Sequence, residues 1–438
     1  MMKQIKQLIK RIVPNYFKFN LNFLHTRKNI KKYELYTNSE ISDFQEQKIK
    51  KLLIHCYENV PYYTNLMVSL NVSPYESASS IGILKKLPIL TKDKFRKNIE
   101  QFKAKNSIKF KPSWKQTSGS TGAPTKYMQD KQLDTVTRVI VNNHYQNIGH
   151  TNGYIAVFRG TLIDDFENKE MIYKILGKEI HFSTFKMDDK VINKYIEILN
   201  QFKPEIIRGY PSALLILLMH IKKYNLKVHQ PKALHTSSEV ISEELIKLSK
   251  DFFNCQVYDY YSQGEASIIA YTDVVNKQYY KVLQYFSYVE YLDQGDGTSS
   301  IVGTNLWNYS MPLLRYETED LTLNNECLDQ NLLKNIIGRK ADIVEGKNGK
   351  KISPSSFHHY WKSKVDKNLK NNVSFYQVIQ KKEQSIFLVK VVKKKCDEDE
   401  KVIKIKLLEL LGQDAIIIIE YLDEIPSGQK WRTTVVEK

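Results

Sequence analysis

The sequence predicts an α/β protein, in which a large N-terminal α/β domain of layered sheets and helices precedes a small α+β C-terminal domain. The chain has 438 residues, of which 42% are hydrophobic, and this length suffices for one large domain and a smaller one. From residue 154 onward, short apolar runs alternate with helical stretches, which is typical of a buried sheet covered by helices. After Gly338 the pattern changes to short strands around one helix, so we expect a domain boundary near residues 339–342.

The alternating segment defines the elements of the large domain. Short apolar runs predict strands at residues 154–158, 206–209, 233–236 and 256–260. Helical spacing of apolar residues predicts helices at residues 191–200, 213–224 and 243–253. An earlier helical pattern at residues 44–66 breaks at Pro61, and Thr91 is the expected N-cap of a later helix. Further strands, in a more antiparallel arrangement, are expected between residues 279 and 307.

The two ends of the chain have patterns of their own. Residues 1–35 form a basic extension, in which Ile5, Leu8, Ile9 and Ile12 follow helical spacing opposite a Lys/Arg face. Such a helix either packs its apolar stripe on the main domain or lies on an anionic membrane surface. Residues 36–338 then form the large domain, and residues 339–438 form the small one. The small domain is expected to contain strands at residues 375–379, 386–392 and 416–421 and a helix at 399–411.

Composition argues against several classes of protein. No apolar run reaches the roughly 20 residues of a membrane span, and no secretory signal is visible, so we expect a cytoplasmic protein. The four cysteines are far apart and the ten histidines show no HExxH spacing, which argues against a disulfide framework or a zinc site. A net charge of +18 attracts polyanions. Nucleic acid is nevertheless not expected as a partner, because no nucleic-acid-binding signature is present.

The strongest local signal is the segment at residues 117–126, which reads TSGSTGAPTK. Small hydroxyl residues between glycines allow backbone N–H groups and hydroxyls to approach phosphate oxygens closely. The spacing is not that of a Walker A loop. The segment therefore predicts a phosphate-binding loop of a different kind, formed by Ser118, Gly119, Ser120, Thr121, Gly122 and Lys126.

This loop resembles the phosphate loop of the adenylate-forming superfamily, also called the AMP-binding superfamily. FQEQK at residues 44–48 with NVPYY at 59–63, LPILTK at 87–92 and GYPSAL at 209–214 resemble the phenylacetate–CoA ligase-like branch. That branch includes proteins of capsular polysaccharide biosynthesis. The resemblance extends from about residue 40 to the C-terminus, with the motifs in the family order, and it implies that the small C-terminal domain is mobile.

The resemblance also implies an adenine site. Ser238 and Glu239 follow a predicted strand and correspond to the family segment beside the adenine ring. In YYSQGE at residues 260–265, Tyr261 takes the place of the aromatic residue that stacks on adenine, and Glu265 that of the acid that holds Mg²⁺. Ser262 and Gly264 depart from the family's Gly and Thr/Ser, and the loss of that hydroxyl puts one family contact in question.

Three later motifs complete the site that the resemblance implies. RYETED at residues 315–320 makes Asp320 the acceptor of the ribose hydroxyls, although Glu319 replaces a family Gly. GRKAD at 338–342 resembles the hinge, and Arg339 would contact ribose or phosphate. Lys430, in a C-terminal loop with one extra residue at Gln429, matches the lysine that reaches the carboxylate and the α-phosphate. The catalytic residues implied are Lys430, Thr121 and Glu265.

The resulting prediction is an enzyme that uses ATP and Mg²⁺ to convert a carboxylic acid to acyl-AMP, releasing pyrophosphate. The acyl group then passes to coenzyme A, or to an amine or hydroxyl on a sugar or lipid-linked glycan, with a role in surface polysaccharide biosynthesis. The basic N-terminus favours a glycan acceptor and a peripheral contact with the inner membrane face. The rival hypothesis is a non-catalytic AMP-binding or scaffold protein at the membrane surface, which the altered Ser262, Gly264 and Glu319 favour.

Overall fold

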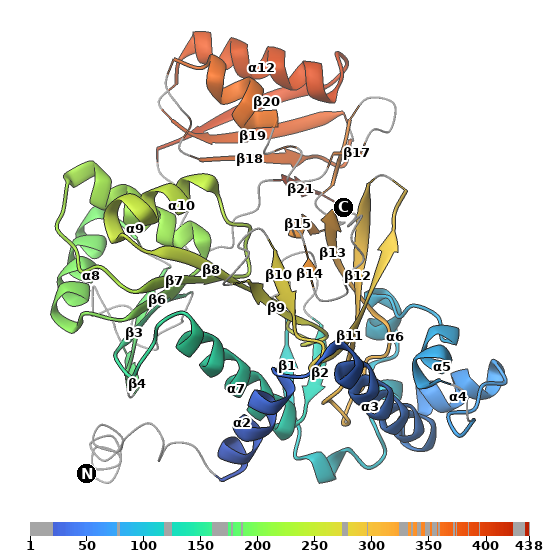
Figure 1. Ribbon diagram of the computed structural model, residues 1–438. Helices are drawn as coiled ribbons and strands as arrows, with labels where there is room; N and C mark the ends of the chain where they lie inside the picture. Colours follow the sequence, from blue (N-terminus) through green and yellow to red (C-terminus); the bar gives the residue numbers. More distant parts are fainter. Residues whose placement is uncertain are drawn as a thin grey trace.

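The architecture is described by a computed structural model. It describes residues 21–76, 79–117, 125–159, 174–176, 178–184, 187–273, 279–295, 297–323, 332–333, 336–339, 343–346, 351–352, 357, 360–370, 373, 375–383, 385–393, 395–423 and 434–437. A broad body contains the described residues from 21 to 339, and a smaller unit stands above it (Figure 1). The predicted layered α/β fold is confirmed. The predicted helix around residues 5–12 lies outside the described residues.

A nine-stranded sheet forms the centre of the body, in the order β14-β10-β9-β8-β7-β6-β3-β5-β4. Its five middle strands, from β8 to β5, are parallel. The bounds are β3 (Ile155–Arg159), β4 (Lys174–Leu176), β5 (Glu179–Ser183), β6 (Ile206–Gly209), β7 (Ala233–Ser237), β8 (Gln256–Ser262), β9 (Ile269–Thr272), β10 (Tyr280–Val282) and β14 (Leu332–Leu333). The four strands predicted in this region are confirmed as β3, β6, β7 and β8.

The two faces of this sheet carry different side chains, because successive residues of a strand point to opposite sides. One face is apolar, with Phe158, Ile180 and Leu234 packed beneath helices α8, α9 and α10. These helices span Asp189–Phe202, Pro211–Tyr224 and Glu243–Leu248, and a π-turn, η4 (Ser249–Phe253), ends the last one. All three predicted helices are thus confirmed. The opposite face lies under α7 (Lys131–Asn147; Figure 1). It carries polar side chains as well as apolar ones.

A second, antiparallel sheet, β11-β12-β13-β15, and a two-stranded hairpin, β1–β2, complete the sheets of the body. Their bounds are β11 (Ser287–Asp293), β12 (Thr298–Asn305), β13 (Tyr316–Leu323), β15 (Ile336–Arg339), β1 (Ser113–Gln116) and β2 (Lys126–Gln129). The helices before them are α2 (Leu21–Tyr33), α3 (Asn38–Asn59), α4 (Pro61–Ser69), α5 (Ser80–Lys86), α6 (Lys92–Lys97), η2 (Ile99–Phe102) and η3 (Ser107–Phe110). The break at Pro61 is confirmed, and α2 buries Phe23 and Ile30 in the cluster that includes α7 residues.

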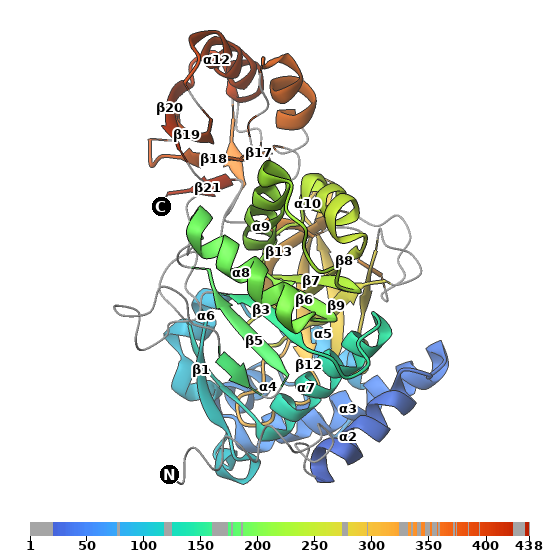
Figure 2. The same ribbon diagram turned by 90° about the vertical axis from the view of Figure 1, so that its left-hand side faces the viewer.

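The unit above the body has its own core, in which the rings of Trp361 and Tyr376 stack at 3.9 Å. Its elements are β16 (Val344–Glu345), β17 (Lys351–Ile352), η7 (Trp361–Val365), η8 (Asp366–Asn368), β18 (Phe375–Gln380), β19 (Ile386–Val392), α12 (Asp397–Leu411), β20 (Ile416–Leu422) and β21 (Thr434–Val436). The predicted strands and helix are confirmed, and four acidic residues in the first turn of α12 favour its start at Asp397. The limits 1–35, 36–338 and 339–438 stay predictions. Figure 2 shows this unit from the side.

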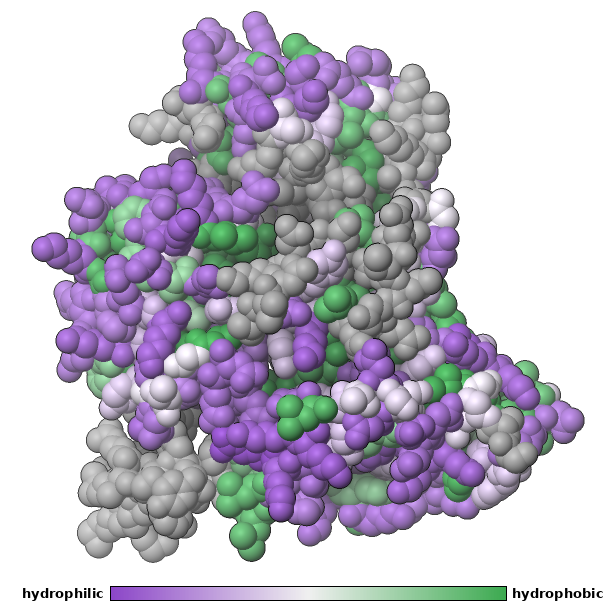
Figure 3. All heavy atoms as spheres, viewed as in Figure 1, coloured by the Kyte–Doolittle hydropathy of each residue, from purple (hydrophilic) through white to green (hydrophobic). Residues whose placement is uncertain are grey.

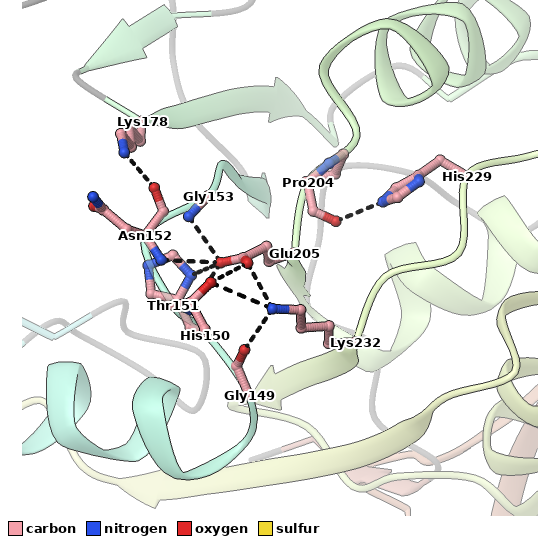
Figure 4. A network of polar contacts seen from close by, with 10 residues as sticks. All are labelled: Gly149, His150, Thr151, Asn152, Gly153, Lys178, Pro204, Glu205, His229 and Lys232. Carbon is pink, nitrogen blue, oxygen red and sulfur yellow. Dashed lines mark hydrogen bonds and ion pairs between the residues drawn. The ribbon is translucent and has the colours of Figure 1, made fainter.

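The amino ends of β3, β6 and β7 meet at the carboxylate of Glu205 (Figure 4). Its Oε2 accepts hydrogen bonds from the backbone N–H groups of Thr151, Asn152 and Gly153 at 2.9, 3.2 and 2.8 Å. Its Oε1 accepts one from Lys232 Nζ at 2.6 Å. Burial opposes ionisation, but these hydrogen bonds outweigh it and hold the pKa of Glu205 well below its usual range. This carboxylate therefore ties three parallel strands together.

Gly153 has to be a glycine for this arrangement, since an added Cβ would lie 2.5 Å from Glu205 Cγ. The surface is largely hydrophilic over the C-terminal unit and over α8–α10 (Figure 3), in keeping with a net charge of +18. In the part of the chain that the structure describes, no helix combines the length and apolarity needed to cross a bilayer.

Candidate active site

The hairpin β1–β2 holds the two ends of the predicted phosphate loop. Thr117 N donates to Thr125 O at 3.0 Å, and Thr125 N donates to Thr117 Oγ1 at 2.9 Å. From α6, Arg96 Nε donates to Thr125 Oγ1 at 2.7 Å. Lys126 begins β2 with its side chain exposed. The predicted residues between these ends, Ser118, Gly119, Ser120, Thr121 and Gly122, lie outside the described residues.

Tyr261 and Asp320 meet although 59 positions separate them. The hydroxyl of Tyr261, on β8, donates to Asp320 Oδ2, on β13, at 2.8 Å. Gln263 Nε2 lies 3.5 Å from the same oxygen. Burial, reinforced by the charge of Asp320, raises the pKa of Tyr261 well above its usual value, so the phenol stays a donor. The structure thus brings together two predicted site residues and adds Gln263, which the sequence analysis did not single out.

Arg339 lies at the same level of the second sheet as Asp320. In the register of β13 and β15, the two residues are direct antiparallel partners. Gly338, which precedes Arg339, has a φ of +111°, a conformation that favours glycine. The predicted hinge sequence therefore begins on the strand next to the predicted ribose acceptor.

Glu265 is buried, with 5% of its surface exposed. Its Oε1 accepts a hydrogen bond from the hydroxyl of Tyr316 at 2.9 Å. Burial, followed by the charge of Glu265, raises the pKa of both Tyr316 and Tyr127, a residue of β2. A buried carboxylate held by a neutral donor therefore lies near the hairpin that carries the loop.

Gly264 shows how closely this segment approaches the hairpin. A Cβ added at Gly264 would lie 3.1 Å from Thr117 Cγ2 and 3.3 Å from the hydroxyl of Tyr127. Both distances are tighter than ordinary van der Waals contact. The replacement of the family's Thr or Ser by Gly at this position thus has a steric reason in this chain.

The residues of this site fit a magnesium ion that also binds substrate phosphates. Magnesium takes oxygen ligands and is usually held by one or two carboxylates together with phosphates and water. Glu265 supplies one such carboxylate beside the ends of the predicted phosphate loop. Among the described residues, no group of three or more His, Cys, Asp or Glu side chains forms a complete metal site.

Ser238 and Glu239 follow the carboxyl end of β7. Ser238 is exposed and has a φ of +76°. Glu239 Oε2 accepts a hydrogen bond from Ser212 N, at the start of α9, at 2.9 Å. The segment GYPSAL is therefore joined to the segment SSE, so two motifs of the sequence analysis lie side by side.

The segment LPILTK pairs with the segment RYETED. Leu90 N donates to Arg315 O at 2.9 Å, and Glu317 N donates to Leu90 O at 3.0 Å. Lys92 Nζ lies 3.4 Å from Glu319 Oε2. The predicted N-cap is confirmed, since the Thr91 side chain accepts from Lys94 N. Lys92 thereby becomes a neighbour of the ribose-site strand, although its sequence motif gave no sign of this.

Left-handed backbone conformations gather around this site. Of the nine described non-glycine residues with positive φ, five lie at the ends of helices, where such a conformation is common. The other four are Ser238, Ala266, Arg315 and Glu319, with φ of +76°, +54°, +52° and +64°. Glu319 therefore adopts the conformation in which the family has a glycine. Strain of this kind is typical of functional sites.

Comparisons with known proteins agree with this geometry. A family model described as the CapK C-terminal domain matches residues 344–437. Protein CapK of Staphylococcus aureus is 23% identical over 405 residues, covering 89% of this chain and 87% of that protein. A phenylacetate–coenzyme A ligase of Aromatoleum evansii is also 23% identical, over 70% of this chain and 72% of its own length.

Solved structures show the same fold. A 2-hydroxyisobutyryl-CoA ligase in the postadenylation state has a TM-score of 0.66 at 15% identity, covering 92% of this chain and 90% of its own. An acyl acid amido synthetase has a TM-score of 0.58 at 11% identity and covers 98% of this chain and 96% of its own.

The chain thus has the fold of the CoA ligase and amido synthetase structures. In sequence it is similar to CapK and to phenylacetate–CoA ligase, and its residues 344–437 match the CapK C-terminal domain. The side chain of Arg339 and all of Lys430 lie outside the described residues, so their roles stay predictions.

Proposed function

We propose that the protein activates a carboxylic acid with ATP and then transfers the acyl group to an acceptor. In the first step a carboxylate oxygen attacks the α-phosphorus, the bond to the bridging oxygen breaks, and pyrophosphate leaves with its electron pair. In the second step the acceptor attacks the acyl carbon and AMP leaves. The observation that supports this best is that Asp320, Glu265 and the ends of the phosphate loop converge from segments up to about 200 residues apart.

The described residues have distinct roles in this proposal. Asp320 accepts the two ribose hydroxyls, for which a carboxylate has enough acceptor sites, and Tyr261 and Gln263 orient it. Ser238 and Glu239 lie beside adenine, and Tyr261 contributes its ring to the same pocket. Ser118, Gly119, Ser120, Thr121, Gly122 and Lys126 bind phosphate oxygens.

Glu265 is the proposed magnesium ligand, and Tyr316 positions it through the hydrogen bond to Oε1. A bound magnesium ion supplies positive charge that neutralises the phosphates of ATP. Lys430, from the C-terminal unit, stabilises the charge that develops in the first step, and Arg339 contacts ribose or phosphate at the hinge.

The acceptor is coenzyme A, or an amine or hydroxyl of a sugar or lipid-linked glycan. The basic residues 1–35 support the second alternative, because lipid-linked glycans lie at the membrane surface, and the resemblance to capsular polysaccharide proteins points the same way. A single-turnover assay separates the two. Enzyme loaded with acyl-AMP should release AMP when mixed with coenzyme A in the first case, and only when mixed with an amino sugar or a glycan in the second.

Pyrophosphate exchange tests the proposal as a whole. Protein supplied with ATP, Mg²⁺ and a panel of carboxylic acids should incorporate labelled pyrophosphate into ATP with the correct acid. Formation of ADP and orthophosphate would contradict adenylation. Binding of AMP without exchange for any acid would favour the non-catalytic protein, which is supported by the altered positions Ser262, Gly264 and Glu319.

A further inference from the structure

Two half-buried arginines lie at the carboxyl ends of the parallel strands, on the face of the central sheet that α7 covers. Arg159 is the last residue of β3, and Arg208 is the penultimate residue of β6. In the register of the two strands, Arg208 pairs with Val157, so both arginines point to the same face. Ligands of open α/β sheets bind beyond the carboxyl ends of their strands.

Both guanidinium groups are met by hydroxyls. Arg159 donates to Ser237 Oγ at 3.0 Å, and Arg208 donates to the hydroxyl of Tyr145 at 3.0 Å. Within the described residues, the Nε atom of each arginine is buried without a hydrogen-bond partner, and no ion pair to either arginine is formed. A charge with buried donors normally has a counter-charge, and the single carboxylate near the two arginines, Glu179, leaves one positive charge for a further anion.

Of the other titratable groups on this face, Glu179 supplies one negative charge against the two positive charges of the arginines. Glu179, on β5, is engaged by His181 at 3.0 Å, and the bond from His181, followed by the charges of Arg208 and Arg159, lowers its pKa. Burial lowers the pKa of His144 to about 4 and that of His235 well below its usual value. Both imidazoles are thus neutral at pH 7, and the positive charge of this face is carried by the arginines.

The position of Arg159 relates this charge to the proposed nucleotide site. Its side chain crosses β6 to reach Ser237 on β7, two strands away, which is roughly 10 Å at the usual strand spacing. Ser238 and Glu239, the proposed neighbours of adenine, follow Ser237 directly. The loop between β1 and β2 is followed, after β2, by α7, the helix that covers this face and carries Tyr145.

We propose that the carboxylic acid substrate carries a second oxyanion, a carboxylate or a phosphate ester, which Arg159 and Arg208 bind while the first carboxylate reacts with ATP. This inference rests on the proposed function and defines its substrate class. Arginine suits the role because its planar donors match carboxylate and phosphate oxygens in pairs. A short acid fits best, because the guanidinium of Arg159 is held one strand away from β8.

Matched acids test the proposal in the pyrophosphate-exchange assay. The pairs are butyrate and succinate, pentanoate and glutarate, hexanoate and adipate, and glycerate and 3-phosphoglycerate. In at least one pair the dianionic acid should have a KM about 10- to 100-fold lower, the range for a charge-assisted hydrogen-bonded pair. The dicarboxylates and the phosphate ester distinguish the two kinds of oxyanion. If the neutral-tailed acid has a KM as low as that of its dianionic partner in every pair, the inference is wrong and the proposed function still stands.

Variants assign the effect to the two arginines. Arg159→Gln and Arg208→Gln should remove the preference for the dianionic acid and leave the KM for ATP unchanged, and Arg208→Lys should retain part of it. Arg138→Gln, which removes the same charge from the exposed side of α7, should change nothing. A raised KM for ATP without a change in acid preference would show that the arginines bind nucleotide phosphates, and the inference would fail.

A binding measurement without ATP separates this inference from the proposed function. Succinate, glutarate, adipate and 3-phosphoglycerate are compared with their neutral-tailed partners as stabilisers in thermal unfolding. A rise in Tm with a dianion that disappears in Arg159→Gln and Arg208→Gln, in a protein that exchanges no pyrophosphate, would support the oxyanion site and overturn adenylation. No rise in Tm with any of the four dianions, together with no preference in exchange, would overturn the oxyanion site. Unfolding curves of each variant alone show whether it is folded.

Discussion

The charged side chains at the two ends of strands β3, β6 and β7 differ in how completely they are compensated by neighbouring groups. At the amino ends, Glu205 accepts hydrogen bonds from three backbone N–H groups and from Lys232. At the carboxyl ends, Arg159 and Arg208 donate hydrogen bonds to hydroxyl oxygens, and among the described residues neither forms an ion pair. The same three strands therefore carry a compensated carboxylate at one end and two incompletely compensated guanidinium groups at the other. The contacts of Glu205 stabilise the sheet, and the two arginines are placed to bind an anionic ligand.

The backbone shows the same contrast. Near Glu205, the left-handed conformation falls on a glycine, Gly149, with a φ of +102°. Around the candidate active site it falls on Ser238, Ala266 and Glu319, whose Cβ atoms make this conformation sterically unfavourable. Uncompensated charge and strained backbone both reduce stability, and proteins accept them where function requires them. Substitutions at the amino ends should thus change stability without changing catalysis, and those at the carboxyl ends should change catalysis, with smaller effects on stability.

The largest effect on catalysis is expected for Lys430→Ala. If the lysine meets the reacting atoms mainly in the transition state, its loss lowers the rate of acyl-AMP formation about 10²–10³-fold, with little change in ATP binding. Stopped-flow or exchange rates with the activated acid measure this. Lys438→Ala is the control for loss of one C-terminal charge.

The second half-reaction sharpens this expectation. Started from synthetic acyl-AMP, acyl transfer by Lys430→Ala should stay within a few-fold of the unmodified protein, because the lysine acts in the first step. If Lys430→Ala and Lys438→Ala behave alike in the first step, the role proposed for this loop is wrong.

The largest effect on stability is expected for Glu205→Ala. The variant removes the ion pair with Lys232 and the acceptor of three backbone N–H groups, which costs about 3 kcal/mol of unfolding free energy. Urea unfolding measures the loss, and Glu197→Ala, on the exposed side of α8, should cost less than about 0.5 kcal/mol. The rate of acyl-AMP formation per folded molecule should be unchanged. A variant as stable as the control would contradict the role of Glu205 in joining the strands.

The stability that Glu205 provides should depend on pH in the acid range. Because the pKa of Glu205 is lower in the folded protein than the value of about 4.3 in an unfolded chain, the ionised form stabilises the fold above pH 4.3. This contribution is lost as the pH falls from there through the folded pKa. The difference in unfolding free energy between the protein and Glu205→Gln should therefore be constant from pH 6 to pH 5 and shrink below pH 4. A constant difference down to pH 3 would show that ionisation of Glu205 does not contribute.

The sequence predicted much of the fold because its signals are local. The strands β3, β6, β7 and β8 and the helices α8 and α9 follow from apolar spacing, and the N-cap at Thr91 follows from its chemistry. The proximity of Tyr261 and Asp320 was predictable only through the resemblance, since nothing local links two strands in different sheets.

The remaining features depend on contacts that spacing does not reveal. Arg159 ends the short apolar run IAVFR, and Arg208 lies in the run IIRG. In both sequences the arginine is where a strand that ends in solvent would have a charged residue. Only the sheet register places both on one face under α7. The reason for Gly264 likewise lies in Thr117 and Tyr127, which are distant in the sequence. The pairing of Lys92 with Glu319 depends on the contact between helix α6 and strand β13.

A smaller effect is expected for Gly264→Ala, in the candidate active site. The added Cβ would crowd Thr117 Cγ2 and the hydroxyl of Tyr127, and overpacking of this kind costs about 1–2 kcal/mol. Thr117→Ser removes the crowded methyl group and keeps the hydroxyl that accepts from Thr125 N. The double variant Gly264→Ala with Thr117→Ser should thus recover about half of the lost unfolding free energy. Equal losses in the single and double variants would mean that crowding at Thr117 is not the cause.

The smallest effect is expected at Glu319 in the candidate active site, where two substitutions separate the contribution of backbone strain from that of charge. Glu319→Ala removes the partly exposed pair with Lys92, worth about 0–1 kcal/mol, and keeps a side chain at a φ of +64°. Glu319→Gly removes the same pair and also the steric penalty of that conformation. Since a Cβ in the left-handed region costs about 1 kcal/mol, Glu319→Gly should be more stable than Glu319→Ala by about that amount in urea unfolding. Glu197→Gly and Glu197→Ala, in the helical interior of α8, provide the matched comparison, because there glycine should be the less stable residue by about 1 kcal/mol. If position 319 is strained, the difference in unfolding free energy between the glycine and alanine variants has opposite signs at positions 319 and 197. The same sign at both would mean that position 319 is not strained.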